Sequence, residues 1–224
     1  LRYIKQYING LNKISNERIF YELKKILNLK NLYDLFTNTT SKTIFENIFP
    51  QIKHYERLKK IKSFGQNLEK RFDNNLILAL LLVDQSNDYE YFCHKYKTSN
   101  NTKNRLKNIS NNFDNLKSKK FYSEENIRKL IYLLGKDYVK DLLLFSFGLN
   151  NKFKNLNIEK LVSYVDICEI PKFPISGDYL KKYGYVAGEA LGKKLKSLEE
   201  NWINNNFVMD KKVVKQLLGK NREN

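Results

Sequence analysis

Apolar residues recur three and four positions apart along most of the chain, which is the spacing of one face of an α-helix. After Ser15, a residue that often caps helices, one such stripe consists of Ile19, Leu23, Ile26 and Leu27. No stretch of useful length alternates apolar and polar residues as a half-buried strand would. The pattern therefore predicts an all-α chain of short helices with no obvious repeat.

The middle and the end of the chain carry further stripes of the same kind. We expect one helix to begin at Ser123 and end at Gly135, the next to end near Gly148, and another to begin at Asn157. The stripes are Ile127, Leu130, Ile131 and Leu134; Val139, Leu142 and Leu143; Ile158, Leu161, Val162 and Val165; Leu191, Leu195, Leu198 and Trp202; and, after Asp210 as a cap, Val213, Val214 and Leu217.

The charge and the composition of the chain suggest a polyanionic partner. The 224 residues suffice for one or two domains with a buried core, and they carry a formal net charge of +17. Lys far exceeds Arg, and Asn, Ile, Tyr and Phe are abundant, a joint bias that an AT-rich genome gives any protein. The charge alone is therefore weak support for nucleic acid. Residues 98–120 are rich in Asn and Lys and are expected to form a basic loop or an exposed helix.

An acidic cluster is the first candidate for chemistry. Asp84, Asp88 and Glu90 follow an apolar run and could hold a metal, although their position favours the end of a helix and the start of a loop. The two histidines, His54 and His94, leave few choices for a catalytic base and complete no zinc site. The sequence therefore predicts no metal site on this chain.

The apolar run and the cysteines bear on the compartment. Residues 76–83 are far too few to span a bilayer, which takes about 20 residues. Cys93 and Cys168 suggest no disulfide framework. We expect a cytoplasmic protein without a membrane partner.

The stretch from Ile170 to Trp202 holds two of the three prolines and four of the nine glycines. Its pattern is Pro-x-x-Pro-Ile-Ser-Gly-x-x-Leu, followed by a glycine and then Gly-x-x-x-Gly. Ser176 is expected to cap a short helix, and Gly184 to end it. Gly188 and Gly192 are expected on one face of the next helix, where missing side chains allow either tight helix packing or close approach of a phosphate.

These residues resemble the bacterial class II tRNA nucleotidyltransferases, which comprise the CCA-adding enzymes and their poly(A) polymerase relatives. The stretch from Ser15 to Leu27 is similar to the family's Ser-x-Glu-Arg-Ile segment, and the proline-glycine motif to its RNA-facing tail. The resemblance covers essentially the whole chain. It implies an elongated helical array with a neck at residues 1–70, a body at 71–170 and a tail at 171–224.

The resemblance also implies roles for individual residues. Glu17 and Arg18 would support the pocket for the nucleobase, and each needs another partner because sequence neighbours on a helix do not face each other. One departure is Glu189, which stands where members often carry proline. The residues expected to bind RNA are Arg2, Lys5, Lys172, Ser176, Gly177, Lys181, Lys182, Gly188, Lys193 and Lys194.

The family's catalytic head is not recognisable in this sequence. The head carries a Gly-Ser pair and an Asp-x-Asp motif for two Mg²⁺ ions, and neither motif occurs in the chain. We therefore expect a fragment that is inactive by itself, without a cofactor on this chain. Its expected partners are tRNA and a separately encoded head.

Three interpretations of the function follow. The first, which the Pro-Ile-Ser-Gly motif and the short extension after Leu218 favour, is the tRNA-binding C-terminal portion of a CCA-adding enzyme. The second is the C-terminal part of a poly(A) polymerase. The third is a stand-alone or decayed helical RNA-binding fragment without activity.

Overall fold

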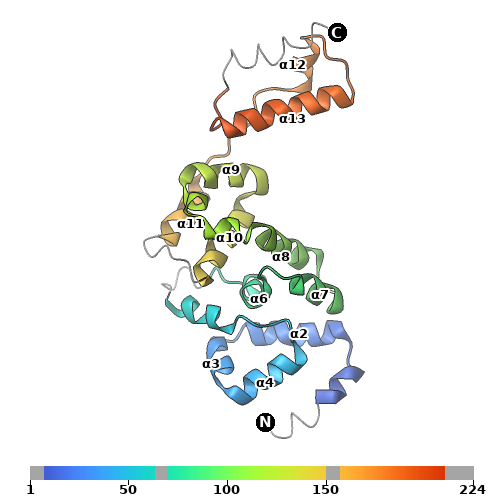
Figure 1. Ribbon diagram of the computed structural model, residues 1–224, viewed down its shortest axis with the longest axis vertical. Helices are drawn as coiled ribbons and strands as arrows, with labels where there is room; N and C mark the ends of the chain where they lie inside the picture. Colours follow the sequence, from blue (N-terminus) through green and yellow to red (C-terminus); the bar gives the residue numbers. More distant parts are fainter. Residues whose placement is uncertain (1–7, 64–69, 150–156, 210–224) are drawn as a thin grey trace.

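The computed structural model describes residues 8–63, 70–149 and 157–209, and every regular element in these ranges is a helix. The all-α prediction is therefore confirmed for this part of the chain. Figure 1 shows an elongated molecule in which the helices follow one another along the long axis, from the N-terminal end to α12 and α13 at the other end. The arrangement places α2 and α13 far apart.

The N-terminal end is built from short helices around α2. Ser15 caps α2 as predicted, because its Oγ accepts a hydrogen bond of 3.3 Å from the backbone N–H of Arg18. Phe20, Leu23 and Leu27 form the buried face of α2, and α6 packs against it. The elements are η1 (Ile8–Lys13), α2 (Asn16–Leu27), α3 (Leu32–Thr37), α4 (Thr39–Ile48) and η2 (Tyr55–Ser63).

The central part surrounds α6 on several sides. Within α6, Leu78, Ala79, Leu80 and Leu81 are all at most 1% exposed, because η2, α8 and α10 contact this helix. The apolar run 76–83 is thus a core helix. The elements are α6 (Asn74–Leu82), α7 (Asp88–Lys95), α8 (Asn100–Asn112), η3 (Asn115–Lys117), η4 (Lys119–Tyr122), α9 (Glu124–Leu134), α10 (Lys136–Gly148) and α11 (Ile158–Ile167).

The predicted ends of these helices agree with the structure. Ser123 caps α9 through a hydrogen bond of 3.2 Å from the N–H of Asn126, and Gly135 follows with a φ of 87°. Gly148 is the last residue of α10, and it has a packing role that the pattern does not show. A Cβ at Gly148 would collide with the side chain of Leu80, so glycine lets α10 lie close against α6. None of the described helices combines the length and the apolarity that crossing a bilayer requires.

The segment 98–120, for which the sequence left a loop or an exposed helix open, is largely a helix with one buried and one exposed face. Residues 100–112 form α8, and the short elements η3 and η4 follow. Leu106 and Ile109 are buried against the core, whereas Lys103 and Lys107 lie on the exposed side. The lysines of this segment are therefore held on an ordered surface.

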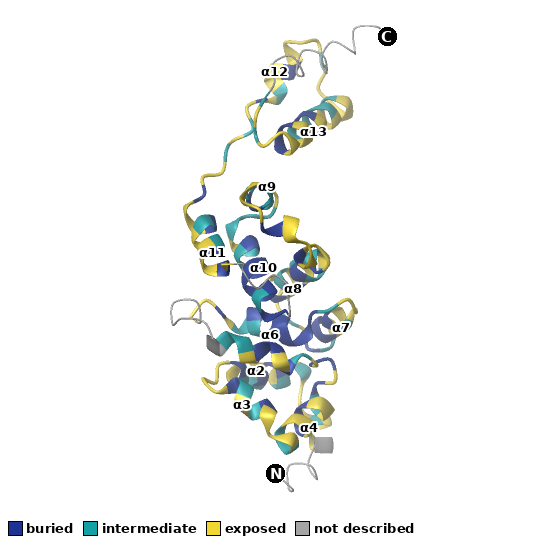
Figure 2. Cartoon of the chain, turned by 60° about the vertical axis from the view of Figure 1, so that its left-hand side comes forward, coloured by how far each residue is buried: buried dark blue, intermediate teal, exposed yellow. Residues whose placement is uncertain are grey.

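The described residues pack around two separate hydrophobic clusters (Figure 2). The large cluster runs from Phe20 to Cys168 and joins the N-terminal and central helices without a break near residue 70. The neck–body division at that position stays a prediction drawn from the family. The small cluster consists of Ile175, Leu180 and Leu198. It belongs to α12 (Gly177–Lys181) and α13 (Glu189–Asn204), which a thin linker connects to the rest (Figure 2).

Candidate nucleic-acid interface

Glu17 and Arg18 have separate partners, as their adjacency requires. The carboxylate of Glu17 lies 2.6 Å from Nζ of Lys97, and the hydrogen bond from Lys97 lowers the pKa of Glu17. Arg18 pairs with Glu22 one turn along α2, at 3.2 Å. Lys97 has a φ of 47°, a left-handed conformation that follows the end of α7. Glu17 therefore ties the start of α2 to the chain after α7.

A polar groove of about 440 Å³ lies beside this ion pair. Asn12 and Asn16 line it from η1 and α2, Asn47 from α4, and Lys95 and Lys97 from the end of α7. The amides and ammonium groups offer hydrogen-bond donors to an incoming polar molecule. Glu17 itself lines the groove, but its role and that of Arg18 toward a nucleotide stay a prediction.

The excess of positive charge is not spread evenly. Residues 1–70 carry 14 Lys and Arg against 6 Asp and Glu, residues 71–168 carry 16 against 11, and residues 169–224 carry 11 against 7. The N-terminal region is thus the most basic, although the sequence motifs drew attention to the tail. A polyanion would be attracted along the whole length of the molecule.

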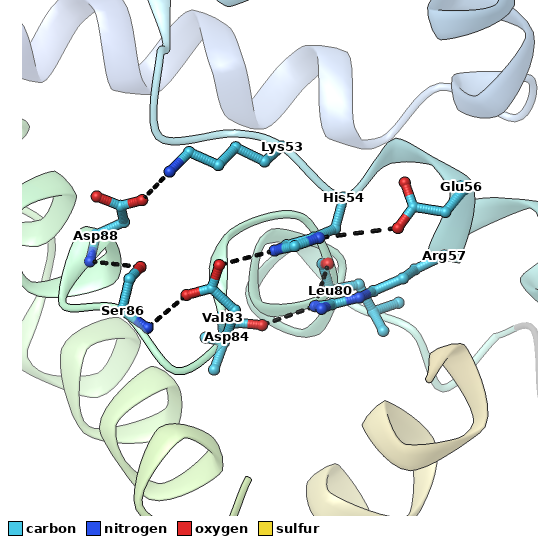
Figure 3. A network of polar contacts seen from close by, with 9 residues as sticks. All are labelled: Lys53, His54, Glu56, Arg57, Leu80, Val83, Asp84, Ser86 and Asp88. Carbon is cyan, nitrogen blue, oxygen red and sulfur yellow. Dashed lines mark hydrogen bonds and ion pairs between the residues drawn. The ribbon is translucent and has the colours of Figure 1, made fainter. Parts of the chain in front are cut away.

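The acidic cluster after α6 is engaged in hydrogen bonds and ion pairs (Figure 3). Asp84 accepts from the N–H of Ser86 at 2.7 Å and lies 3.0 Å from Nε2 of His54, while Asp88 pairs with Lys53. Burial opposes the charge of Asp84, but the bonds from Ser86 and His54 prevail and lower its pKa to about 2. No metal-binding group of His, Cys, Asp and Glu occurs among the described residues.

Arg57 lies beside this network (Figure 3). Its side chain is buried and donates to the carbonyl oxygens of Leu80 at 3.1 Å and Val83 at 2.7 Å (Figure 3). Carbonyl groups at the end of a helix lack partners within the helix, and a guanidinium beside them satisfies two at once. Arg57 thus fastens η2 to the end of α6, and no feature of the sequence singled it out.

A second network fills the crevice between α6, α8 and α10. Arg105 donates to both carboxylate oxygens of Asp141 at 2.7 Å and also pairs with Asp73. Arg71 pairs with Asp166 at 2.9 Å. These guanidinium groups pair with carboxylates of the chain itself, so their contacts hold the helices together.

In the tail motif, Ser176 and Gly184 bound a single turn of helix. The Oγ of Ser176 accepts a hydrogen bond of 3.2 Å from the N–H of Tyr179, which confirms the predicted cap. Gly184 follows α12 with a φ of 91°, a conformation that glycine adopts without strain. Leu180 is completely buried against α13. The motif therefore fixes the turn that presents the neighbouring side chains.

The expectation that Gly188 and Gly192 share a helix face was wrong. Gly188 precedes α13 as its N-cap with a φ of 153°, whereas Gly192 lies within the helix. A Cβ built on either residue meets nothing within 4 Å. Tight packing within the described chain therefore explains neither glycine, and the approach of a phosphate to Gly188 stays a prediction.

The tail lysines differ in their partners. Lys181 pairs with Asp178 at 2.9 Å, and Lys193 pairs with Glu189 at 2.7 Å. This pair sets a positive charge beside the acidic residue that departs from the family pattern. Lys182 is exposed. The other predicted RNA-binding residues divide into those on the tail, namely Lys172, Ser176, Gly177 and Lys194, and those outside the described residues, namely Arg2 and Lys5.

The tail meets the body through aromatic side chains that sequence reasoning assigned to helix stripes or passed over. Tyr132 of α9 packs edge-on against Trp202 with ring centroids 5.4 Å apart, and its hydroxyl donates to Glu199. Phe207 covers both rings at 5.7 and 5.0 Å. Burial and the bond to Glu199 raise the pKa of Tyr132 to about 12. This junction sets the direction of the tail.

Two family models match the chain and together span nearly all of it. A model described as tRNA nucleotidyltransferase domain 2 matches residues 68–218. A model described as "Probable RNA and SrmB-binding site of polymerase A" matches residues 1–56. No curated protein sequence matches significantly.

Solved structures with the same fold include several CCA-adding enzymes. A complex of the Thermotoga maritima CCA-adding enzyme with tRNA superimposes with a TM-score of 0.55 over 96% of this chain, at 17% sequence identity. Complexes of a CCA-adding enzyme with ATP and with CTP give TM-scores of 0.57 and 0.58, at 17% and 16% identity over 96% and 97% of this chain. The chain spans 54% of the length of each of these proteins.

Proposed function

This chain belongs to the tRNA nucleotidyltransferase domain 2 family, and we propose that it is the tRNA-binding C-terminal portion of a CCA-adding enzyme. The observation that carries the proposal is the family match over residues 68–218, because it includes both the central helices and the tail motif. The fold of CCA-adding enzymes over 96% of the chain supports the same conclusion.

The chain would hold RNA by its shape and its phosphates. Double-stranded RNA exposes phosphates and 2′-hydroxyl groups, whereas its deep major groove hides the base edges from side chains. Exposed lysines on α8, such as Lys103 and Lys107, and on the tail, such as Lys182, suit such contacts. Because α8 and the tail helices lie apart along an elongated molecule (Figure 1), one RNA would be held at separated points.

The chemistry would belong to a head domain and not to this chain. In a CCA-adding enzyme, CMP and AMP pass from CTP and ATP to the 3′ end of tRNA, and Mg²⁺ organises the displacement in the head. We propose no metal or cofactor site on the present chain. Its contribution would be to fix the 3′ end relative to that head, whether the head is covalently linked or separately encoded, in the cytoplasm.

A poly(A) polymerase is the second candidate, since the model that matches residues 1–56 is described by reference to polymerase A. The solved structures with the same fold favour the CCA-adding enzyme over it. The two candidates predict different preferred RNAs. A CCA-type grip should prefer folded tRNA over unstructured RNA of equal length, and a polymerase-type grip should not.

The test uses the purified chain with labelled tRNA. We expect binding that an excess of unstructured RNA displaces poorly, and no incorporation of CMP or AMP when CTP, ATP and Mg²⁺ are added. Absence of tRNA binding would contradict the proposed function. Incorporation of nucleotide would contradict the assignment of catalysis to a separate head.

A further inference from the structure

Two tyrosines of the tail are exposed to solvent, whereas a leucine between them in the sequence is buried in the small hydrophobic cluster. Tyr179 and Tyr183 are 37% and 42% exposed, whereas Leu180 between them is 0% exposed. Leu180 anchors the turn to α13, so the turn directs the two rings away from the small hydrophobic cluster. Neither ring belongs to that cluster or to the residues packed against it.

The two rings form a preassembled aromatic surface. Their centroids lie 5.1 Å apart at an interplanar angle of 43°, and the hydroxyl oxygens of Tyr179 and Tyr183 are 3.1 Å apart, within hydrogen-bond distance. Each ring therefore restrains the other. An ordered aromatic side chain loses little further conformational freedom when a flat ligand stacks on it.

The charges around the rings identify the kind of ligand. Lys181 and Lys182 lie between the two tyrosines in the sequence, and both are exposed. Lys181 already pairs with Asp178, whereas Lys182 forms no ion pair among the described contacts, although its charge also acts on Asp178. Aromatic faces beside an ammonium group suit a nucleobase with its phosphate, because the base stacks while the phosphate is neutralised.

We propose that Tyr179 and Tyr183 form a stacking platform for an unpaired base of the bound RNA, with Lys182 contacting the adjoining phosphate. The proposal rests on the proposed function and deepens it by naming the part of the RNA that meets the tail. A base inside a duplex has both faces covered by its neighbours, so only a base in a loop or at an end can stack on a protein ring. The tail would therefore recognise an unpaired part of the RNA.

The first experiment compares three forms of the full chain by fluorescence anisotropy with labelled tRNA. Removing both rings, Tyr179→Ala with Tyr183→Ala, should weaken binding by about 5- to 150-fold, the range expected when a base loses its stacking partner. The matched control, Tyr179→Phe with Tyr183→Phe, keeps the rings and loses only the hydroxyl pair, so its affinity should stay within about twofold of the unmodified chain.

A second RNA locates the effect on the unpaired base. A blunt RNA duplex offers phosphates but no free base except at its ends, so the alanine pair should bind it nearly as well as the unmodified chain does. Lys182→Gln should instead weaken both RNAs and reduce the slope of log affinity against log salt by about 1.

Chemical protection tests the platform without any variant, which covers the case that the alanine pair does not fold. tRNA should protect Tyr179 and Tyr183 from nitration by tetranitromethane, read by mass spectrometry, and the blunt duplex should not. Equal tRNA affinity of the alanine pair and the unmodified chain, or no protection at saturating tRNA, would overturn the platform while the proposed function stands. Failure of the unmodified chain to bind tRNA would overturn both.

Discussion

The body and the tail differ in how much core holds them together. One hydrophobic cluster from Phe20 to Cys168 runs through all helices from α2 to α11, whereas the tail has a cluster of three buried residues and a thin linker (Figure 2). The tail contacts the body at Tyr132, which meets Trp202, Phe207 and Glu199, and at Lys129, which donates to the carbonyl oxygen of Asn204. The difference indicates a body with a large continuous core and a tail with a small core of its own.

The unfolding of the tail can be measured apart from that of the body, because Trp202 is the only tryptophan of the chain and lies at the junction of the two regions. Its fluorescence reports the tail, while circular dichroism at 222 nm reports mainly the more numerous helices of the body. We expect the fluorescence transition in urea to precede the dichroism transition. Coincident transitions would show that body and tail unfold as one unit.

The largest expected effect lies in the body, at the buried pair of Arg105 and Asp141. The side chains are 17% and 10% exposed, so Asp141→Leu leaves a guanidinium largely out of water with only Asp73 beside it. Breaking a buried pair costs about 3–5 kcal/mol, and the dichroism midpoint should fall accordingly.

The control for that variant replaces both partners. Arg105→Met together with Asp141→Leu removes the unpaired charge and should recover most of the lost free energy of unfolding. A loss in Asp141→Leu below about 1 kcal/mol, the level of exposed pairs, would contradict a stabilising role for this network.

The next largest effect on stability is expected in the small hydrophobic cluster of the tail. Leu198 is 1% exposed, and Leu198→Ala should lower the free energy of tail unfolding by about 2–5 kcal/mol, the range for buried leucines. The Trp202 fluorescence transition should shift while the main dichroism transition stays in place. Leu195→Ala on the same helix is the control with a partly buried side chain, and its effect should be smaller. An equal shift of both transitions would contradict a separate tail.

The junction should respond to alkaline pH through Tyr132. Burial and the bond to Glu199 raise its folded pKa to about 12, above the ordinary value of 10, so the unfolded tyrosine loses its proton first. The stabilisation is complete below pH 10 and disappears as the pH rises toward 12. Trp202 fluorescence should change over that window. Tyr132→Phe should abolish this pH-dependent change in fluorescence. If the change persisted in Tyr132→Phe, another titrating group would be responsible for it.

The smallest effect is expected at the tail glycines. Gly192→Ala should raise the stability of the tail by about 0.5–1 kcal/mol, since alanine restricts the unfolded chain and its Cβ meets nothing within 4 Å. Gly188→Ala is the matched control and should destabilise, because a φ of 153° is strained for any side chain. Destabilisation by Gly192→Ala in the urea transition would show that the helix is packed more closely than the structure has it.

Much of the fold could be predicted because it depends on helix caps and apolar stripes, which are short-range features of the sequence. The stripes of α2, α9 and α13 and the caps Ser15, Ser123 and Ser176 depend on neighbours within a turn or two, which the sequence displays directly. Gly188 shows the limit. Its spacing from Gly192 fits one face of a helix, but α13 begins only at Glu189. Because the helix begins one residue after Gly188, this glycine is the N-cap and not a residue of the helix face.

The side chains that connect distant segments could not be predicted. Arg57 meets Leu80 and Val83, and Tyr132 meets Glu199, across separations that no single-sequence pattern encodes. The i, i+4 spacing of Tyr179 and Tyr183 was visible, but their exposure depends on Leu180 turning inward against α13, which is a tertiary fact. Glu17 needed a partner by its adjacency to Arg18, and only the structure identifies Lys97.

The central claim is that this chain grips tRNA mainly through its phosphates, and the salt dependence of binding tests it most directly. A protein that neutralises six to ten phosphates loses about 10³- to 10⁵-fold in affinity between roughly 50 and 200 mM salt. We predict that the dissociation constant for tRNA rises by at least about 100-fold over this interval, because even somewhat fewer phosphate contacts would produce a change of that size. An affinity that stays constant across the titration would contradict the account.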